Sequence, residues 1–462
     1  MTDRLILRPE QEAAVQRALD EPTWSVLNAS EMSAGKTVMH VEQGLRMGAN
    51  IVVIVGPLGT VDGWAKTLHR QSGGKYELRH ITSKKAGQAH YHALLSGEPG
   101  WYFIGREYFR TKAIDVARIH ADLGVVDEVQ VYANRKSVGH KKLMQFQPVH
   151  KVACSGTWFG NKVENMWGVT RWLWPQQTDR SFWRWVDTWL TTEYDHFAGK
   201  KVTGEKNPGA YAESLPCYIR IEPTLVELET PEERWVDLSP QQRKMYDKME
   251  RDMFVEVESD VLMTEVPIAM RTRLRQITMA VCDAESYTEF DFDKGVEVVK
   301  QRVWFPEDAK STKFDELKAL IEERPDEPML ILTDSAQWVR LATSRLPDAF
   351  AWMGGVSQDE RNAAKRAFID GRLKYIVAQV ASVAEGVDGL QLACNTVVWA
   401  SQSDSPMLNA QALKRVHRTG QDKPVRQVFI KARDTIDDEQ HLALLNKQLQ
   451  IKAALASGEQ LV

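Results

Sequence analysis

The sequence predicts an α/β protein with two parallel-sheet domains in tandem and a tryptophan-rich, helical insertion between them. Its 462 residues are too many for one ordinary hydrophobic core, because domains of about 150 residues are typical. Apolar residues make up 43% and charged residues 26%, the balance of a globular chain, which argues against collagen, coiled coil and disorder. Short apolar runs alternate with amphipathic stretches in both halves, as they do when helices connect buried parallel strands.

The expected strands fall into two sets of β-branched runs. The first set comprises residues 24–27, 51–55, 102–104, 123–126 and 152–154, and the second comprises residues 329–332, 374–377, 396–399 and 425–430. Continuous apolar runs of this length are typical of strands that are buried on both faces of a sheet. We therefore place a first domain at residues 1–222, a linker with a helical protrusion at 223–305 and a second domain at 306–462.

The region between the two sets has a different composition. Tryptophans crowd it at Trp158, Trp167, Trp172, Trp174, Trp183, Trp185 and Trp189. Because tryptophan fills cores by sheer area, we expect a structural sub-core at about residues 158–200, with a stacking platform for single-stranded bases as the alternative. Residues 197–211 and the acidic residues 284–294 are typical of loops, the first of them mobile. Residues 239–280 are expected to be helical from the Ser239-Pro240 cap onward.

The charge balance excludes a globally basic wrapper of nucleic acid. Lys and Arg number 59 against 63 Asp and Glu, a net charge of −4. A nucleic-acid partner would therefore need local positive surface. The basic pairs at residues 84–85, 135–136, 141–142 and 200–201 are typical of solvated faces, although some of them would line such a path.

Nothing in the sequence indicates a membrane or an oxidising compartment. The apolar runs are far shorter than the roughly 18 residues of a membrane span. The N-terminus becomes polar too early for a signal peptide, so we expect a cytoplasmic protein. Cys154, Cys217, Cys282 and Cys394 are scattered without a C-x-x-C pair, which indicates reduced thiols.

A candidate phosphate-binding loop follows the first expected strand. Residues 30–37 read Ser-Glu-Met-Ser-Ala-Gly-Lys-Thr, close to the pattern G-x-x-x-x-G-K-[ST] with a serine in the first position. Gly35 lets backbone N–H groups approach phosphate oxygens, and the helix that begins there adds its positive end. Lys36 would reach the β- and γ-phosphates of ATP, and the Thr37 hydroxyl would ligate Mg²⁺. We also count Ser33 and Ala34 among the ATP-binding residues; the alternative is a chance Gly-Lys-Thr in a surface loop.

A pair of carboxylates at the end of another expected strand supports the ATP interpretation. The run 123–126 ends in Asp127 and Glu128, the arrangement known as Walker B. Asp127 would hold Mg²⁺ directly or through water, and Glu128 would act as the general base on the attacking water. Alone, such a pair is more often a solvated loop, but together with the Gly-Lys-Thr segment it predicts an ATPase.

With these motifs in place, the chain resembles superfamily-2 helicases and, within them, the Swi/Snf-type DNA-dependent ATPases. The resemblance covers nearly the whole chain. In the first half it is carried by residues 7–11 (LRPEQ), 29–37 (ASEMSAGKT, similar to the family's A-D-E-M-G-x-G-K-T), 55–58 with Trp64, 155–157 (SGT), 161–174 and 274–277 (LRQI). In the second half it is carried by residues 329–335, 354–357 with Arg361, 411–421 and 435–437. The most specific match is 411–421, which fits Q-A-x-x-R-x-x-R-x-G-Q.

The resemblance implies two RecA-like lobes that hold ATP and Mg²⁺ between them and act on DNA. Gln11 would read the adenine edge, and Gln421 would join the ATP-binding set. Arg415 and Arg418 would act as arginine fingers on the developing γ-phosphate charge, and His417 between them would pack or hydrogen-bond. The residues implied in DNA contact or in coupling are Pro57, Trp64, Ser155, Thr157, Gly354 and Ser382.

One segment departs from the Swi/Snf pattern. Residues 385–389, which follow Ser382, read Glu-Gly-Val-Asp-Gly where the Swi/Snf type usually has a glycine-rich A-G-G-x-G-L-N. This segment is closer to the general superfamily-2 pattern, which leaves the subfamily open.

The predicted function is an ATP-dependent DNA translocase or helicase that steps along the DNA backbone. We expect it to remodel branched or duplex DNA in replication, recombination or repair, as a monomer in a microbe or virus, with replication or recombination proteins as possible partners. The alternatives are an RNA helicase, and a nucleotide-gated DNA clamp or partner subunit with little turnover. The motor of a restriction system would need a nuclease site, and we find no such constellation in the sequence.

Overall fold

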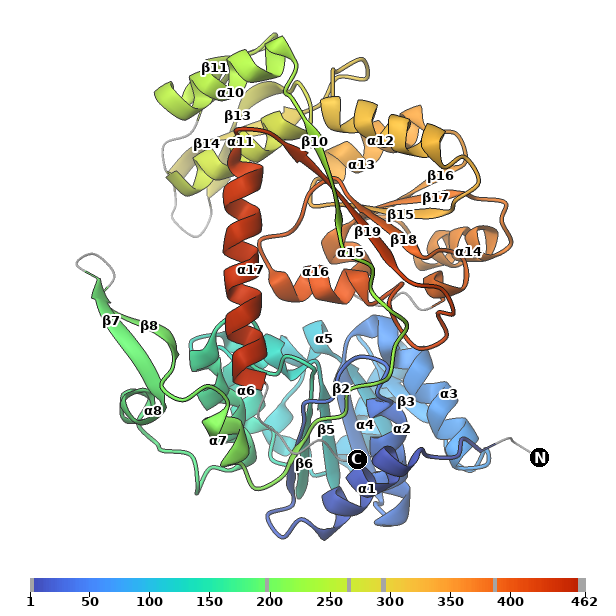
Figure 1. Ribbon diagram of the computed structural model, residues 1–462. Helices are drawn as coiled ribbons and strands as arrows, with labels where there is room; N and C mark the ends of the chain where they lie inside the picture. The colour runs from blue at the N-terminus through green and yellow to red at the C-terminus, as the bar shows by residue number, and fades with distance from the viewer. Residues whose placement is uncertain (1–3, 196–198, 264–266, 292–295, 385–388, 456–462) are drawn as a thin grey trace. The chain divides into compact units, whose positions relative to one another are not determined.

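The computed structural model describes residues 4–195, 199–263, 267–291, 296–384 and 389–455 (Figure 1). The chain divides into two compact units. The first unit comprises Met1–Thr224 together with Lys447–Val462, and the second comprises Leu225–Asn446. Each unit is built around its own parallel sheet, so the predicted α/β class is confirmed.

The first unit contains a seven-stranded sheet in the order β3-β4-β2-β5-β6-β1-β9, in which all neighbours are parallel. Its strands are β1 (Ser25–Asn28), β2 (Ile51–Gly56), β3 (Leu78–Ile81), β4 (Gly100–Gly105), β5 (Leu123–Asp127), β6 (His150–Cys154) and β9 (Tyr218–Ile219). Every strand expected in this half is present. The sequence analysis missed β3 and β9, which lie at the two edges of the sheet and are too short or too polar to form a continuous apolar run.

Helices connect the parallel strands of the first unit, as crossover connections require. They are α1 (Pro9–Asp20), α2 (Lys36–Arg46), α3 (Val61–Gln71), α4 (Lys85–Leu95), α5 (Arg106–Arg110), α6 (Val138–Gln145) and α7 (Met166–Leu173). Helix α2 packs against both α1 and α3. Gly44 in α2 allows the Trp101 ring of β4 to approach, because a Cβ there would lie 2.6 Å from that ring.

The tryptophan-rich insertion consists of α7, α8 (Phe182–Trp189), the antiparallel hairpin of β7 (Leu190–Asp195) and β8 (Gly199–Glu205), and α9 (Ala210–Glu213). Trp158, Trp172, Trp174 and Trp185 are buried, which supports the structural sub-core. The loop expected at residues 197–211 is wrong for 199–205, because the Lys-Val-Thr residues of β8 pair with β7. Residues 197–198 lie outside the described part of the chain.

The second unit contains a six-stranded parallel sheet in the order β10-β19-β18-β15-β17-β16. Its strands are β10 (Glu232–Val236), β15 (Met329–Thr333), β16 (Ala349–Trp352), β17 (Tyr375–Gln379), β18 (Thr396–Trp399) and β19 (Arg426–Ala432). Its helices include α12 (Thr312–Glu323), α13 (Ala336–Arg345), α14 (Gln358–Ile369), α15 (Val380–Ala384) and α16 (Pro406–Leu413), while α17 (Ile436–Leu455) begins in this unit and belongs to the first unit from Lys447 onward. Strand β10 pairs with β19, so part of the expected linker at 223–305 belongs to this sheet.

The remainder of that expected linker mixes helices with two hairpins. Helices α10 (Pro240–Asp252) and α11 (Pro267–Met279) are separated by the hairpin of β11 (Phe254–Glu256) and β12 (Val261–Met263), so residues 239–280 are not continuously helical. The acidic loop expected at 284–294 is wrong up to residue 291. Those residues form β13 (Asp283–Asp291), which pairs with β14 (Val296–Trp304), and residues 292–294 lie outside the described part. The acidic side chains had concealed Tyr287, Thr288 and Phe290, residue types that suit a strand.

Two further expectations concern the chain as a whole. Within the described ranges, no helix has the length and apolar character needed to cross a bilayer. All four cysteines are buried thiols, as expected.

Candidate nucleotide-binding site

Three adjacent strands of the first unit bring the predicted phosphate loop and the carboxylate pair to one edge of the sheet. Asn28 at the end of β1 pairs with Cys154 of β6, which in turn pairs with Asp127 of β5. Because neighbouring strands lie about 4.8 Å apart, the ends of β1 and β5 are separated by roughly 10 Å. The loop 29–35 leaves this edge and leads directly into α2.

The loop holds two residues in the left-handed backbone region. Gly35 has φ +90°, and a Cβ there would overlap the side-chain nitrogen of Gln11, so glycine is required on both grounds. Ser33 has φ +67°, a conformation that costs a non-glycine residue of the order of 1 kcal/mol. It occupies the position where the family pattern A-D-E-M-G-x-G-K-T has glycine.

Lys36 points into the curve of its own loop. Its Nζ donates to the carbonyl oxygens of Ser30 at 2.8 Å and Glu31 at 2.9 Å. The loop therefore fixes the ammonium beside the backbone N–H groups that begin α2. Thr37 follows in the first turn of that helix and is half-buried.

A buried network of polar side chains from β1 and α2 supports the loop. The Asn28 side chain accepts from Ser30 N at 3.1 Å and contacts His40 Nε2 at 2.9 Å, while His40 Nδ1 lies 2.8 Å from Gln43 Oε1. Burial lowers the pKa of His40 to about 4, so the ring is neutral at physiological pH. Sequence reasoning missed this network, although a polar residue at the end of a buried strand was a usable signal.

Gln11 of α1 is bound to the loop as well. Its Nε2 donates to Ala34 O at 2.8 Å, its Oε1 accepts from Arg8 N at 2.9 Å, and its side chain is buried. Arg8 Nη2 also donates to Ala34 O, at 3.1 Å. The structure thus gives Gln11 a position against the phosphate loop, while its contact with adenine stays a prediction.

The carboxylates occupy an environment that disfavours negative charge. Asp127 is 9% exposed, and burial together with the neighbouring Glu128 raises the pKa of Asp127 to about 6, against the opposing effect of Lys36. Glu128 adopts φ +53° and accepts from Gln130 Nε2 at 2.6 Å. A cation beside Asp127 would relieve the cost of its charge, which fits a Mg²⁺ ligand.

The number of protein ligands also fits Mg²⁺ bound together with a phosphate. Among the described residues, no three His, Cys, Asp or Glu side chains gather as a metal cluster. Magnesium in nucleotide sites is typically held by one or two protein oxygens with the remaining positions filled by phosphate and water. Thr37 and Asp127 at one sheet edge are such a set.

Two residues expected at DNA prove to be internal. Trp64 is 1% exposed, and its Nε1 donates to Asp127 Oδ2 at 3.4 Å, so its ring belongs to the core beside the carboxylate. Pro57 is buried at the end of β2, where its carbonyl accepts from Thr60. A buried side chain cannot contact a nucleic-acid backbone, so the DNA part of these two assignments is corrected, while a role of Pro57 and Trp64 in coupling stays a prediction.

The predicted coupling segment lies against the phosphate loop. Ser155 N donates to Asn28 O at 3.1 Å, Thr157 N donates to Ser155 Oγ at 3.1 Å, and a Cβ at Gly156 would contact the backbone of Ser30. A movement of the phosphate loop would therefore displace residues 155–157 directly.

The predicted arginines belong to the second unit and follow α16. Arg415 is 8% exposed, and its Nη2 donates to Ala384 O at the end of α15, whereas Arg418 is half-buried. His417 contacts Val226 O at 2.8 Å, in line with the hydrogen-bonding role expected for it.

Gln421, whose place among the ATP-binding residues stays a prediction, is hydrogen-bonded at both ends of its side chain. Its Nε2 donates to Gln391 O and Cys394 O, and its Oε1 accepts from Asp422 N and Lys423 N. Both ends of the amide thus hold backbone of the second unit. Gly354 is exposed and Ser382 is half-buried on α15, and residues 385–388 of the departing motif lie outside the described part.

Arg275 in α11 binds three groups at the carboxyl edge of the second sheet. Arg275 donates to Asp334 at 2.8 Å, to Asp404 at 2.9 Å and to Gln402 O at 2.7 Å. It lines a cleft of about 430 Å³ at the carboxyl ends of β15 and β18. The segment 402–404 leads into α16, so Arg275 helps to position the helix that precedes Arg415. Sequence reasoning noted this residue only within the Leu-Arg-Gln match.

Comparisons with known proteins are consistent with this geometry. A family model described as "SNF2-related domain" matches residues 14–283. The chain is 25% identical over 435 residues to the mouse protein "SWI/SNF-related matrix-associated actin-dependent regulator of chromatin subfamily A member 1", covering 89% of this chain and 39% of the relative. It is 23% identical over 445 residues to the zebrafish (Danio rerio) protein "Chromodomain-helicase-DNA-binding protein 1-like", covering 88% and 40%. The chain thus spans about two fifths of the length of these relatives.

Among solved structures, the "Sulfolobus solfataricus SWI2/SNF2 ATPase core in complex with dsDNA" is similar over 98% of this chain and 95% of that chain. Its sequence identity to this chain is 16% and the TM-score is 0.40.

Proposed function

The chain belongs to the SNF2-related family of Swi/Snf-type superfamily-2 ATPases, whose family model matches more than half of it, and from this premise we propose that it is an ATP-dependent DNA translocase. The observation that carries the proposal is the register Asn28–Cys154–Asp127. It brings the lysine loop and the two carboxylates to the same edge of one parallel sheet. Phosphates bind at such edges, where helix N-termini and loop N–H groups converge.

We assign the binding and hydrolysis of ATP to named residues of that edge. Lys36, which is already aimed into its loop by two carbonyls, would exchange these partners for the β- and γ-phosphates. Thr37 and Asp127 would hold Mg²⁺, which when bound neutralises charge on the phosphate oxygens. Glu128 would take a proton from the attacking water, with Gln130 orienting its carboxylate.

We assign to Arg415 and Arg418 the role that the family resemblance implies. They would pair with the γ-phosphate as charge develops on it, so that ATP is fully bound only when both units contribute. ATP would then favour the arrangement in which all of these contacts are made, and hydrolysis would remove that preference. Alternating grips on the nucleic-acid backbone would convert this cycle into stepping.

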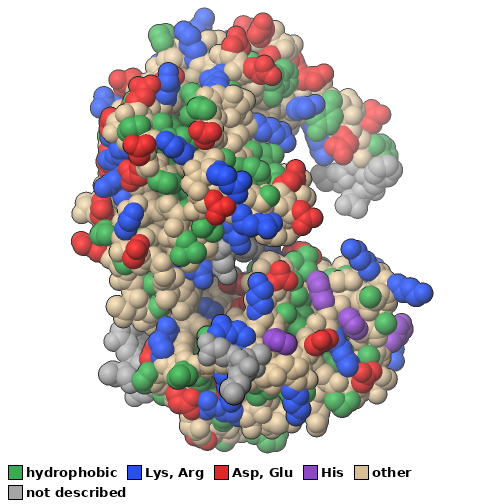
Figure 2. Space-filling view, turned by 90° about the vertical axis from the view of Figure 1, so that its right-hand side faces the viewer, with side chains coloured by type: hydrophobic (Ala, Val, Ile, Leu, Met, Phe, Trp, Pro, Cys, Tyr) green, Lys and Arg blue, Asp and Glu red, His purple; other side chains and the backbone are tan. Residues whose placement is uncertain are grey.

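We propose DNA as the nucleic acid along which the protein moves, because of its family and because the name of one relative includes DNA binding. On the face drawn in Figure 2, basic and acidic side chains are interspersed, in line with the net charge of −4. Binding would therefore depend on local groups of Lys and Arg that contact phosphates, with little base specificity from the motor. Work on branched or duplex DNA in replication, recombination or repair is the finer form of this proposal.

The test is a steady-state ATPase assay with duplex, forked, four-way-junction and single-stranded DNA, and with RNA of equal length. We expect DNA to raise the turnover rate several-fold above the basal rate. The DNA structure that raises it most would indicate which kind of DNA the protein remodels. A greater response to RNA would favour the RNA helicase. DNA binding without turnover on any substrate would favour the nucleotide-gated clamp.

A further inference from the structure

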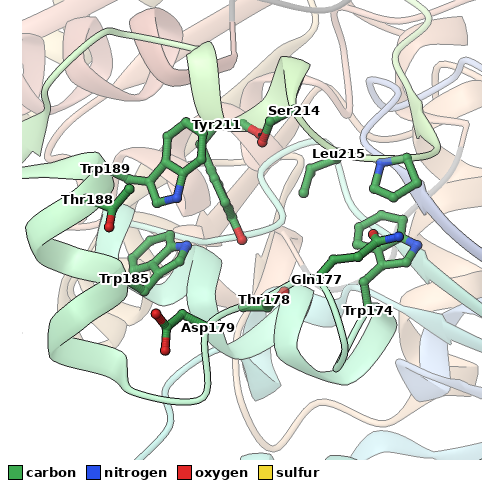
Figure 3. A pocket seen from close by; sticks show the side chains of 11 residues that line it. Trp174, Gln177, Thr178, Asp179, Trp185, Thr188, Trp189, Tyr211, Ser214 and Leu215 are labelled. Atoms are coloured by element: carbon green, nitrogen blue, oxygen red, sulfur yellow. The ribbon is translucent and has the colours of Figure 1, made fainter.

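A small cavity in the tryptophan-rich insertion takes no part in the site described above. Its volume is about 190 Å³, and it lies within the first unit. Trp174, Trp185 and Tyr211 form buried walls, whereas Gln177 and Ser214 at the rim are exposed, so the cavity opens to solvent. Figure 3 shows Trp185 and Trp189 on one side of the cavity and Trp174 on the other.

The aromatic walls are held in place by hydrogen bonds outside the cavity. Tyr211 packs against Trp185 and Trp189 with ring centroids 5.0 Å away in each case, and its hydroxyl lies 2.6 Å from Thr170 Oγ1. Across the cavity, Trp174 Nε1 donates to Thr23 Oγ1 at 2.9 Å. A ring entering the cavity would therefore meet preformed faces and would lose little free energy in ordering them.

The floor of the cavity offers both a donor and an acceptor. The buried Trp185 indole N–H lies near the Tyr211 hydroxyl, yet it makes no hydrogen bond of normal geometry within the described residues. Asp179 lies nearby with a half-buried carboxylate, which accepts from Ser181 N at 2.8 Å, lies 3.7 Å from Arg184 Nε and has further lone pairs. A buried N–H without an acceptor is costly, so a ligand that supplies one is favoured.

Size and polarity together restrict the class of ligand. A protein cavity of about 150 Å³ takes one benzene molecule, so this cavity fits one six-membered ring. A phenylalanine side chain of a partner would leave the Trp185 N–H and the Asp179 carboxylate without a new bond. An organic cation would satisfy Asp179 and the aromatic faces, but it brings no acceptor for Trp185. A pyrimidine base supplies a stacking face, a ring carbonyl and an N–H donor.

We propose that this cavity binds one unpaired pyrimidine base by stacking it among Trp174, Trp189 and Tyr211. The base could belong to a free nucleoside or to a single strand exposed by the motor, and only the second source rests on the proposed function. For the second source, exposed Arg184 on α8 and Lys200 on β8, which pair with Asp179 and Asp187, would have to exchange these carboxylates for the neighbouring phosphates. The insertion would then add base contacts to a motor that otherwise grips the backbone.

The test compares a labelled oligothymidine strand with a strand of equal length made of abasic sugar-phosphate units. Fluorescence anisotropy gives the affinity of the full-length protein for each strand without ATP. We expect the wild-type protein to bind oligothymidine roughly tenfold more tightly than the abasic strand, since base-to-aromatic stacking has effects of that size. Trp189→Leu, which keeps apolar bulk and removes the stacking face, should reduce this ratio to near one while leaving the abasic affinity unchanged.

The matched control is Trp183→Leu. Trp183 lies on the same helix, is 44% exposed and does not line the cavity, so its loss should leave the ratio at the wild-type value. Gln177→Ala, at the exposed rim, gives a second reading in a variant whose fold is not at risk. Free thymidine that competes with the strand would show that the base alone suffices, whereas no competition would show that the strand is needed.

Two results would overturn the proposal. One is equal affinity of the wild-type protein for both strands, as expected if the cavity instead receives a partner's side chain. The other is a ratio that stays at the wild-type value in Trp189→Leu. ATP turnover measured on the same samples separates the two hypotheses: turnover with DNA but no base-dependent binding counts against the cavity alone, and base-dependent binding without turnover counts against the motor alone.

Discussion

The carboxyl edges of the two parallel sheets use charge in opposite ways. At the first edge, Asp127 is buried with a raised pKa, and Ser33 and Glu128 adopt strained left-handed backbone. At the second edge, burial also raises the pKa of Asp334, but Arg275 pairs with Asp334 and Asp404 and opposes this shift, and the buried Lys313 pairs with Asp437 at 2.7 Å. The two parallel sheets thus differ at their carboxyl edges: the first edge has a buried carboxylate with unrelieved charge and a strained backbone, and the second has paired charges. Unrelieved charge is typical of a site that waits for a ligand, and paired charge of a structural element.

The largest expected effect concerns chemistry at the first edge. Glu128→Gln keeps size and shape but removes the proposed general base, so turnover should fall by roughly a hundredfold to ten-thousandfold with ATP affinity retained. Lys36→Ala is the companion variant and should lose ATP affinity as well as turnover. Equilibrium binding of a fluorescent ATP analogue together with an ATPase assay separates the two. A Glu128→Gln protein with near-native turnover would refute the assignment of the base.

The second prediction concerns the stability that is lost when the buried ion pair between Lys313 and Asp437 at the second edge is removed. Asp437→Asn leaves the Lys313 ammonium, 1% exposed, without its counter-charge. We expect the free energy of unfolding of the second unit to fall by about 3 kcal/mol. Urea unfolding monitored by tryptophan fluorescence measures this loss. Lys318→Ala on the same helix, with a side chain that is 64% exposed, is the control and should change stability by less than about 0.5 kcal/mol.

The third prediction is that the same chemical change at the first edge has the opposite sign. The pKa of Asp127 is about 6 in the folded chain against an ordinary value of 3.8, so the carboxylate destabilises the fold progressively as pH rises from about 4 to about 6. Asp127→Asn should therefore stabilise the ligand-free protein by about 1 to 3 kcal/mol at pH 7.5 and by almost nothing at pH 4. It should also abolish the stimulation of turnover by Mg²⁺.

Unfolding curves of wild type and Asp127→Asn at the two pH values measure the difference directly. A destabilised Asp127→Asn protein at pH 7.5 would mean that the bonds from Glu128 N and Trp64 outweigh the cost of burial, and the contrast between the edges would fail.

The difference between the edges also marks what the sequence could predict. Strands buried on both faces, such as β2 and β15, were predicted because they are continuous apolar runs. Strands β3 and β10 were missed because they lie at sheet edges and have partly exposed, mixed sequences. Strand β16, also at an edge, is apolar but only four residues long and mostly half-buried. The phosphate loop was predicted because its residues are contiguous. The contact of Trp64 with Asp127 spans 63 positions and that of Arg275 with Asp404 spans 129, and no local pattern encodes such pairs.

The smallest expected effect compares two serines, one after β1 in the first sheet and one after β15 in the second. Ser33 has φ +67°, so Ser33→Gly relieves strain and should raise the free energy of unfolding by about 0.5 kcal/mol after the entropic cost of glycine. Ser335 has φ −92° and its side chain accepts from Trp338 N at 3.2 Å, so Ser335→Gly should lower stability by a few tenths of a kcal/mol through the lost cap. Replicate urea titrations resolve the two signs. If Ser33→Gly were also destabilising, the serine hydroxyl would have to stabilise the loop by more than the left-handed backbone costs it, and the first edge would be less strained than its backbone indicates.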